Sequence, residues 1–173
     1  VRKLRLVDWK KGGGGEVDLI NATGGAFGVE LPSQGTSFEN ALFSLEMLNE
    51  QTGEVRFSMS EPGAWKVTKT YIFEHEKPAF WLETSVQNLS NQTKPAALSL
   101  SAELAVGDEH ARDRYYAESF VLTGDKLSAV RLDKAEKKPY VFEGGIHWLS
   151  LTKKYFALII RPDEKAALSK ITA

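Results

Sequence analysis

The chain has 173 residues, of which 42% are hydrophobic and 26% are charged, the composition of an ordinary globular protein. Basic and acidic residues nearly balance, 22 against 23, so there is no electrostatic footprint for nucleic acid or anionic lipid. The absence of cysteine excludes a disulfide scaffold, a thiolate zinc site and a cysteine nucleophile. The length fits one domain, and we expect a single domain over residues 1–173.

The two ends of the sequence favour a piece of a longer protein. The opening residues, VRKLRLVDWKK, carry charges but lack the apolar stretch of a signal peptide. The closing residues, LSKITA, have no capping feature, so we expect a domain truncated at its C-terminal end. No apolar run approaches the roughly 20 residues that span a bilayer.

Short strands are predicted at the beginning of the chain. Val1–Trp9 and Glu16–Ile20 are strand-like, and Gly12–Gly15 separates them. This glycine run predicts a flexible loop, because a phosphate-binding loop would lead into a helix through Lys-Ser/Thr, whereas EVDLI follows here. The pair Gly24-Gly25 predicts a bend between two further strand-like segments.

The next segments differ in how clearly they alternate. Glu54–Ser60 alternates as a strand, whereas Asn40–Glu50 fits a helix by propensity and a strand by position. The clearest pattern is Trp65–Gln87, two alternating strands joined by the polar turn His75–Pro78. Lys69 is the one exception in an otherwise apolar row, and each strand is predicted to have one apolar and one wetter face. The apolar rows consist of Trp65, Val67, Tyr71 and Phe73, then Phe80, Leu82, Thr84 and Val86.

The second half of the chain continues the strand pattern. Asn88–Lys94 is predicted to be a loop and Ala96–Val106 a long amphipathic strand. Glu109–Glu118 is compatible with one helical turn, and Asp163–Lys170 with a short helix. Many short strands and few helices predict a mainly β fold, a sandwich of two antiparallel sheets.

Three histidines are the candidates for acid–base chemistry near neutral pH. None lies in an H-x-H or H-E-x-x-H arrangement, so a metal site has little support. His75 lies in a predicted turn and His110 in a polar segment, so both are expected to be solvated. His147 lies in a predicted strand and is expected to pack or to bond a carbonyl. The sequence therefore predicts no catalytic residue, no cofactor-binding residue and no metal ligand.

Adjacent carboxylates and the tryptophans are the other patterns with possible chemistry. Paired acids that flank a cleft can hydrolyse glycosides, but neighbours in loops are usually solvated. The parity of Trp65 and Trp148 predicts core residues, whereas Trp81 lies on the polar parity of its strand. Trp81 is therefore the candidate for a cleft or interface residue. The adjacent carboxylates are Asp108-Glu109 and Asp163-Glu164.

Three stretches occur in an order that is similar to one family. The first is EVDLINATGGAFGVEL, a strand, a Gly-Gly turn and a returning strand. The second is Val67–Leu104, in which KTYIF, a short turn and VQN precede a polar loop and a long strand. The third is GGIHWLSLTKKYFALIIRP, with Trp148, Tyr155-Phe156 and Pro162. Together they cover most of the chain and resemble the large periplasmic domain of the YidC family of bacterial membrane-protein insertases.

The resemblance implies a twisted antiparallel β-supersandwich similar to galactose mutarotase, with few short helices. It implies a domain between the first and second transmembrane segments of a membrane-embedded parent, on the periplasmic side of the bacterial inner membrane. It also implies Sec translocon components of the SecD–SecF type and nascent membrane proteins as partners, with no cofactor. The sequence stops soon after Pro162, where the family continues, and lacks the membrane helices whose groove performs insertion.

Three functions are compatible with these observations. The resemblance favours a non-catalytic accessory domain of an insertase. A carbohydrate-binding or mutarotase-like domain is the alternative suggested by the fold family and Trp81, although no histidine–glutamate pair can be assigned to it. A structural spacer for the membrane domain also fits the composition.

Overall fold

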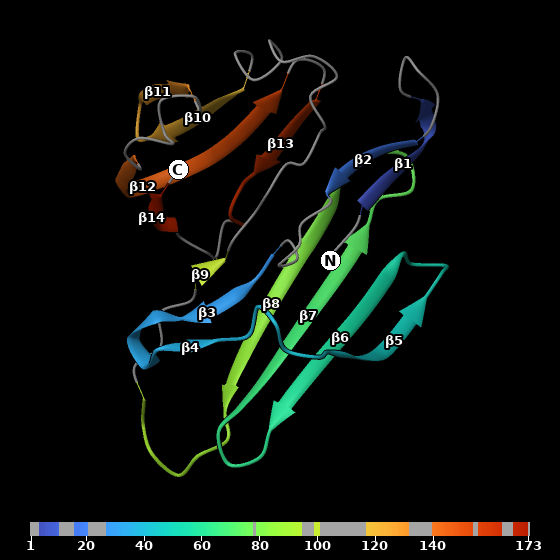
Figure 1. The fold of residues 1–173 in the computed structure, drawn as a ribbon, viewed down its shortest axis with the longest axis vertical. Helices are drawn as coiled ribbons and strands as arrows, with labels where there is room; N and C mark the ends of the chain where they lie inside the picture. Colours follow the sequence, from blue (N-terminus) through green and yellow to red (C-terminus); the bar gives the residue numbers. More distant parts are fainter. Residues whose placement is uncertain are drawn as a thin grey trace. The chain divides into compact units, whose positions relative to one another are not determined.

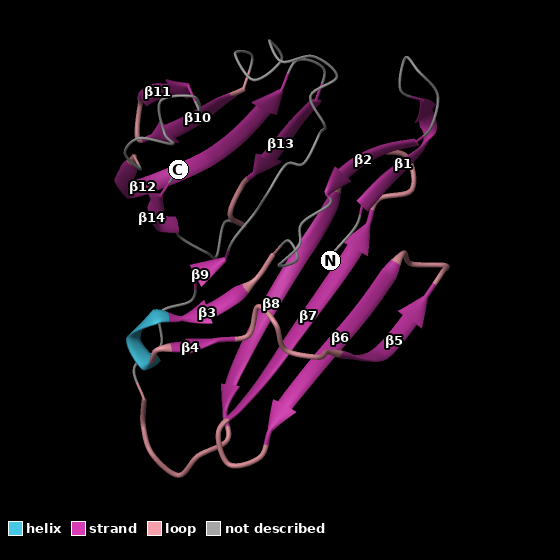
Figure 2. Cartoon of the chain, in the orientation of Figure 1, coloured by secondary structure: helices cyan, strands magenta, loops and turns pink. Residues whose placement is uncertain are grey.

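The computed structural model describes residues 4–10, 16–20, 27–77, 79–94, 99–100, 117–131, 140–153, 156–163 and 168–172. Strands predominate in these ranges, and the one helix among them is the short 3-10 helix η1, Pro32–Gln34 (Figure 2). All strand pairs described are antiparallel, so the predicted mainly β, antiparallel class is confirmed and is consistent with a β-sandwich. No helix in the described ranges is long and apolar enough to cross a membrane.

The chain divides into two compact units. One is contiguous and comprises Phe27–Ser101, and the other combines Val1–Ala26 with Ala102–Ala173. We refer to them as the central unit and the terminal unit. The single domain expected over residues 1–173 remains a prediction.

A four-stranded sheet forms the larger part of the central unit, with the order β5-β6-β7-β8 (Figure 1). The hairpin predicted within Trp65–Gln87 is confirmed, because β7 and β8 pair in register from Trp65–Asn88 to Phe73–Phe80. The segment that fitted both helix and strand is a strand, since β5 lies within it. The bounds are β5 Ser44–Asn49, β6 Glu54–Glu61, β7 Trp65–Phe73 and β8 Phe80–Asn88.

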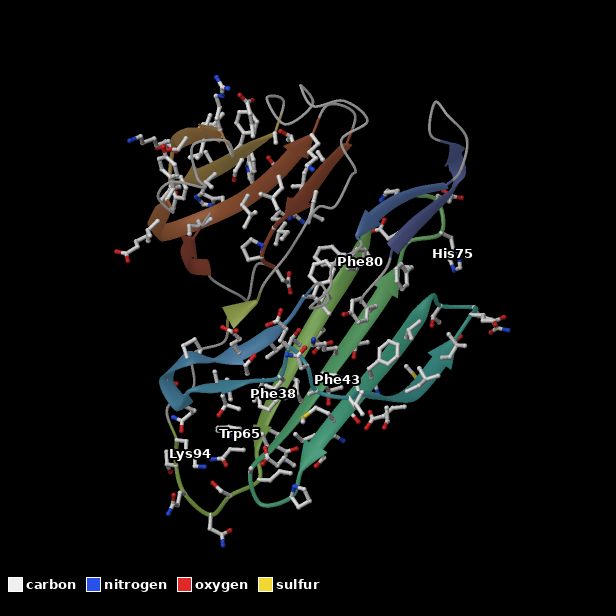
Figure 3. All side chains as sticks on the ribbon, in the orientation of Figure 1. Phe38, Phe43, Trp65, His75, Phe80 and Lys94 are labelled. Carbon is white, nitrogen blue, oxygen red and sulfur yellow. The ribbon has the colours of Figure 1, made fainter. Side chains whose placement is uncertain are left out.

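A small three-stranded sheet packs against one end of this larger sheet. Its order is β4-β3-β9, and η1 connects its first two strands. Val29 and Leu31, which are fully buried, join a core with three residues from the rest of the unit, two of them labelled in Figure 3. These three are Phe38, Trp65 and Val67, and the strands are β3 Val29–Leu31, β4 Thr36–Ser37 and β9 Ser99–Leu100.

The four-stranded sheet has one apolar and one polar face. Directly paired residues share a face, so Leu48, Val55, Tyr71 and Leu82 form one row across the apolar side. Exposure alternates along the whole of β8, as its sequence predicts. A register shift between Leu45 and Met47 changes which face of the sheet the residues of β5 lie on. As a result, Leu45 lies on the same apolar face as Leu48.

The terminal unit contains a hairpin and a five-stranded sheet. In the sheet, β12 lies between β10 and β13, and the first half of β12 also pairs with β14. Val121, Val130 and Ile146 are buried there. The strands are β1 Leu4–Lys10, β2 Glu16–Ile20, β10 Glu118–Thr123, β11 Lys126–Arg131, β12 Val141–Lys153, β13 Phe156–Ile160 and β14 Leu168–Thr172.

The helix expected at Asp163–Lys170 is wrong at its end, because Leu168–Lys170 belongs to β14. Pairing with the free edge of β12 outweighs the helix propensity of this Ala- and Lys-rich segment. Several other expectations lie outside the described residues: Gly12–Gly15, Gly24-Gly25, most of Ala96–Val106 and most of Glu109–Glu118. Of these segments, Ser99–Leu100 is strand β9, and Glu118 begins β10.

Gly53 provides a test of the turn between β5 and β6. Its φ is +67°, and a Cβ there would lie 2.5 Å from the backbone oxygen of Phe73. We expect Gly53→Ala to lower the free energy of unfolding by about 2–3 kcal/mol, from backbone strain and displacement of the Phe73 carbonyl. Gly63 is the matched control, because it has φ +70° and nothing within 4 Å of a Cβ. Urea unfolding of both alanine variants measures the difference, and equal losses would contradict the close approach.

Candidate functional site

An aromatic cluster lies on the apolar face of the four-stranded sheet. Tyr71 is its centre, with ring centroids 5.9–6.5 Å from those of the other four members. Tyr71 is buried, whereas Phe73 at the end of β7 is 39% exposed. The cluster therefore has a packed interior and an accessible rim. Its members are Phe27, Phe57, Tyr71, Phe73 and Phe80.

Lys69 is buried in the apolar face, with 7% of its surface exposed. Its Nζ donates a hydrogen bond to the carbonyl oxygen of Phe27 at 2.6 Å and lies 4.7 Å from the centre of the Phe43 ring. Phe27 has φ +61°, an uncommon conformation for a bulky residue. Lys69 thus ties this strained residue to the sheet, while burial lowers the pKa of the Lys69 ammonium group.

The buried hydroxyl of Tyr71 predicts a loss of stability in alkali. Burial raises the pKa of Tyr71 to about 12, from an ordinary value of 10.0. Above pH 10 the unfolded chain loses this proton while the folded chain keeps it, so folding becomes less favourable as the pH rises towards 12. We expect the wild type to lose about 2 kcal/mol more than Tyr71→Phe over this range.

Urea unfolding of both proteins across that pH range gives the comparison. Because Phe lacks the ionisable hydroxyl, parallel stability curves for the two proteins would contradict a shifted pKa for Tyr71.

The apolar face continues onto the edge strand β5 and becomes exposed there. Leu45 is 56% exposed and Leu48 is similar, although both are large aliphatic side chains. Leu42, immediately before the strand, is 90% exposed. We call Leu42, Leu45 and Leu48 the leucine edge. Exposed aliphatic side chains in a row are typical of a surface that contacts another protein.

The polar face of the same sheet holds a network of hydrogen bonds and ion pairs. Glu46 accepts a hydrogen bond from Ser58 Oγ at 2.5 Å and pairs with Lys66 Nζ at 3.3 Å. Arg56 pairs with Glu54 at 2.9 Å and donates from Nε to Thr70 at 3.3 Å. The hydrogen bond from Ser58 and then the contact with Lys66 lower the pKa of the Glu46 carboxyl. These partially exposed pairs orient side chains and stabilise the fold only weakly.

Trp81 lies on this polar face and is 44% exposed, as its parity predicts. It sits directly across from Ile72, which is also exposed, and its side chain hydrogen-bonds to Glu74. Glu74 also pairs with Lys77 at 2.9 Å, and this contact is the main cause of a lowered pKa for the Glu74 carboxyl. The indole ring of Trp81 is thus exposed, and the hydrogen bond to Glu74 holds one edge of the ring in place.

The predictions for the core tryptophans and for the histidines are confirmed to different extents. Trp65 is buried, as expected, and Trp148 is half-buried in β12. His75 is exposed in the β7–β8 turn, where Nε2 lies 3.3 Å from the Gln51 carbonyl oxygen. His147 lies in a strand as predicted, but it is exposed, so the packing alternative is wrong, and the alternative of a bond to a carbonyl stays a prediction.

The remaining candidates do not form a site in the described ranges. Asp163 is exposed, whereas Glu164, Asp108-Glu109 and His110 lie outside the described residues. Within the described part, no group of three His, Asp or Glu side chains is arranged to hold a metal ion.

Sequence reasoning missed the Lys69–Phe27 contact and the exposure of the leucine edge. The signal for the first was visible, because a lysine interrupted an apolar row. The second required knowledge of which strand lies at the edge of the sheet. The central unit therefore exposes apolar side chains at three places: the aromatic rim at Phe73, the leucine edge and Trp81.

Comparison with known proteins identifies a family. Searches of curated proteins and of solved structures found no significant similarity. The family model described as the YidC periplasmic domain matches residues 5–173, nearly the whole sequence, and so bears out the resemblance seen in its motifs. The chain therefore belongs to the YidC periplasmic domain family.

Proposed function

We propose that this chain is a non-catalytic accessory domain of a YidC-type membrane-protein insertase, and that it contacts Sec translocon components or nascent membrane proteins during insertion. The observation that supports this proposal most directly is the family match over residues 5–173. The family implies a periplasmic location within a membrane protein. The leucine edge and the rim of the aromatic cluster support a role in protein contact, because both expose apolar side chains.

The proposal is tested with the membrane-embedded parent protein in inner-membrane vesicles. Chemical crosslinking through lysines, followed by mass spectrometry, is expected to join this domain to translocon subunits or to nascent chains arrested during insertion. A parent that lacks residues 5–173 is expected to insert dependent substrates more slowly. If no such crosslink forms and every insertion assay is unchanged by the deletion, the proposal is wrong.

Replacing this domain by an unrelated one of similar size distinguishes a role in protein contact from a role as a structural spacer. If the domain only holds the membrane part at a distance, an unrelated β-sandwich domain of similar size restores insertion fully. If the surface of this domain makes the contact, the replacement restores neither insertion nor the crosslinks.

A carbohydrate-binding function is the second candidate, and the exposed indole of Trp81 favours it, because tryptophan faces stack on sugar rings. A mutarotase needs a histidine acid and a glutamate base directed at one sugar. In the described residues, His75 lies in the central unit and His147 in the terminal unit. Polarimetry of anomer exchange tests this candidate: an acceleration that Trp81→Ala abolishes would favour it over the insertase role.

A further inference from the structure

We propose that strand β5 binds an extended, basic polypeptide segment, which adds to the sheet β5-β6-β7-β8 as a further strand. This inference rests on the proposed function and specifies both where the contact is made and which segments it selects. Strand addition of this kind combines main-chain hydrogen bonds with pockets for alternate side chains.

The first argument is the open edge of the sheet. β5 ends the strand order, and β6 is its only partner among the strands that the structure describes. Proteins commonly protect such edges with proline, lysine or a bulge. β5 has a register shift between Leu45 and Met47, but its sequence, SLEMLN, contains neither proline nor lysine. Apart from this register shift, neither proline nor lysine interrupts β5, and no strand among the described residues pairs with its outer side, so backbone groups there are available to a further strand.

The second argument is the apolar surface beside that edge. Leu45 and Leu48 are more than half exposed, and both lie on the apolar face of the sheet. An added strand would place alternate side chains on this face and bury the exposed apolar surface of both leucines, which favours binding. At the opposite edge, the apolar-face residues Leu82 and Val86 of β8 are already half-buried. On the apolar face of this sheet, Leu45 and Leu48 are thus the most exposed large side chains, ahead of Phe73.

The third argument is charge. From Phe38 to Gly53 the sequence contains three glutamates and no lysine or arginine. Glu46 is paired with Lys66 on the polar face, whereas Glu39 and Glu50 are exposed on either side of β5. These carboxylates favour a partner with Lys or Arg near the ends of its paired segment. A second copy of this chain would bring the same glutamates together, and an anionic lipid surface would be repelled, so a basic polypeptide is the occupant that fits.

The test is fluorescence anisotropy of the full 173-residue chain with a labelled strand-length peptide that alternates valine and lysine. Saturable binding is expected, with affinity that falls as salt is added. A peptide with glutamate in place of lysine, and one with alternate backbone amides N-methylated, are expected to bind at least about tenfold more weakly. Equal binding of the N-methylated peptide would overturn strand addition, and equal binding of the acidic peptide would overturn the charge selection.

Variants of the chain locate the site. The double variant Leu45→Lys/Leu48→Lys is expected to lose about tenfold or more in affinity. Leu127→Lys is the matched control, because Leu127 is also 56% exposed and lies in β11 of the terminal unit. Glu39→Gln/Glu50→Gln, which changes only exposed charges, is expected to weaken binding and reduce its salt dependence. The assignment of the peptide site to β5 would be overturned if Leu127→Lys lost as much affinity as the β5 variants, or if the β5 variants lost none.

The same variants distinguish this inference from the proposed function. If the β5 variants abolish peptide binding and the insertase crosslinks together, β5 is the contact site. If the parent protein keeps its translocon and nascent-chain crosslinks with the double β5 variant, the accessory role stands and the assignment to β5 is overturned.

Discussion

Replacement of Trp65 by alanine is expected to lower the free energy of unfolding of the central unit by about 3–5 kcal/mol, because a buried tryptophan is lost from the core. Trp65 packs with Phe38 and Val67 where the two sheets of this unit meet, and its ring lies 5.4 Å from Lys94 Nζ. Val29 and Leu31 of the small sheet belong to the same core cluster, so the loss of the indole ring removes packing from both sheets of the central unit. The variant is expected to loosen the three-stranded sheet first.

Trp81 is the matched control for this prediction, because it lies on the adjacent strand and on the opposite, polar face. Trp81→Ala removes an exposed ring and one hydrogen bond, so its cost is expected to stay below about 1 kcal/mol. Urea unfolding followed by amide hydrogen exchange within residues 27–94 measures both variants. Similar losses for the two tryptophans would show that the core does not depend on Trp65.

The second large effect is expected at Lys69. Lys69→Ala removes the hydrogen bond to the Phe27 carbonyl, leaves that oxygen without its donor and removes the buried apolar stem from the apolar face of the sheet. The unpaired carbonyl and the lost stem together are expected to cost about 2–4 kcal/mol. Lys69→Met also leaves the Phe27 carbonyl without this donor, but it keeps an apolar stem and removes a buried charge, so a smaller cost, about 1 kcal/mol, is expected.

The pH dependence separates the role of the Lys69 charge from that of its packing. Because burial lowers the pKa of Lys69, the unfolded chain binds this proton more tightly than the folded chain does. The stability of the wild type therefore rises with pH between the lowered pKa and the ordinary value of 10.5, and Lys69→Met lacks this rise.

Lys66, on the polar face of the same strand, is the control for both Lys69 variants. Its ion pair with Glu46 is partly exposed, so Lys66→Ala is expected to cost less than about 1 kcal/mol. Urea unfolding at a series of pH values measures all three variants. A Lys69→Met curve parallel to that of the wild type would contradict the shifted pKa.

The sequence predicted the β7–β8 hairpin well, because a period of two and a polar turn are local signals. The burial of Trp65 and the exposure of Trp81 followed from the same parity. At Asp163–Lys170, local propensity favoured a helix, but the end of this segment pairs with β12. That pairing depends on a distant partner, which no window of neighbouring residues can specify.

The candidate site was less predictable than the strands. Lys69 stood out in an apolar row, but its acceptor, Phe27, lies 42 residues away. Likewise, the alternation in β5 does not indicate whether the strand is central or at an edge, and only the strand order exposes the leucine edge. The functional surface therefore depends on topology, whereas the individual strands depend on local sequence.

The division of the chain into an uninterrupted central unit and a split terminal unit also sets an order of assembly. A chain emerging from the ribosome presents β3 to β9 in full before any of β10–β14 has been made. Neighbouring strands in the central sheet follow one another along the chain, so their loops close at low entropic cost. The five-stranded sheet of the terminal unit cannot form in full until β10–β14 have been synthesised. The central unit can therefore begin to fold before the terminal unit does. Its edge strand β5 has already been synthesised while β10–β14 are still being translated.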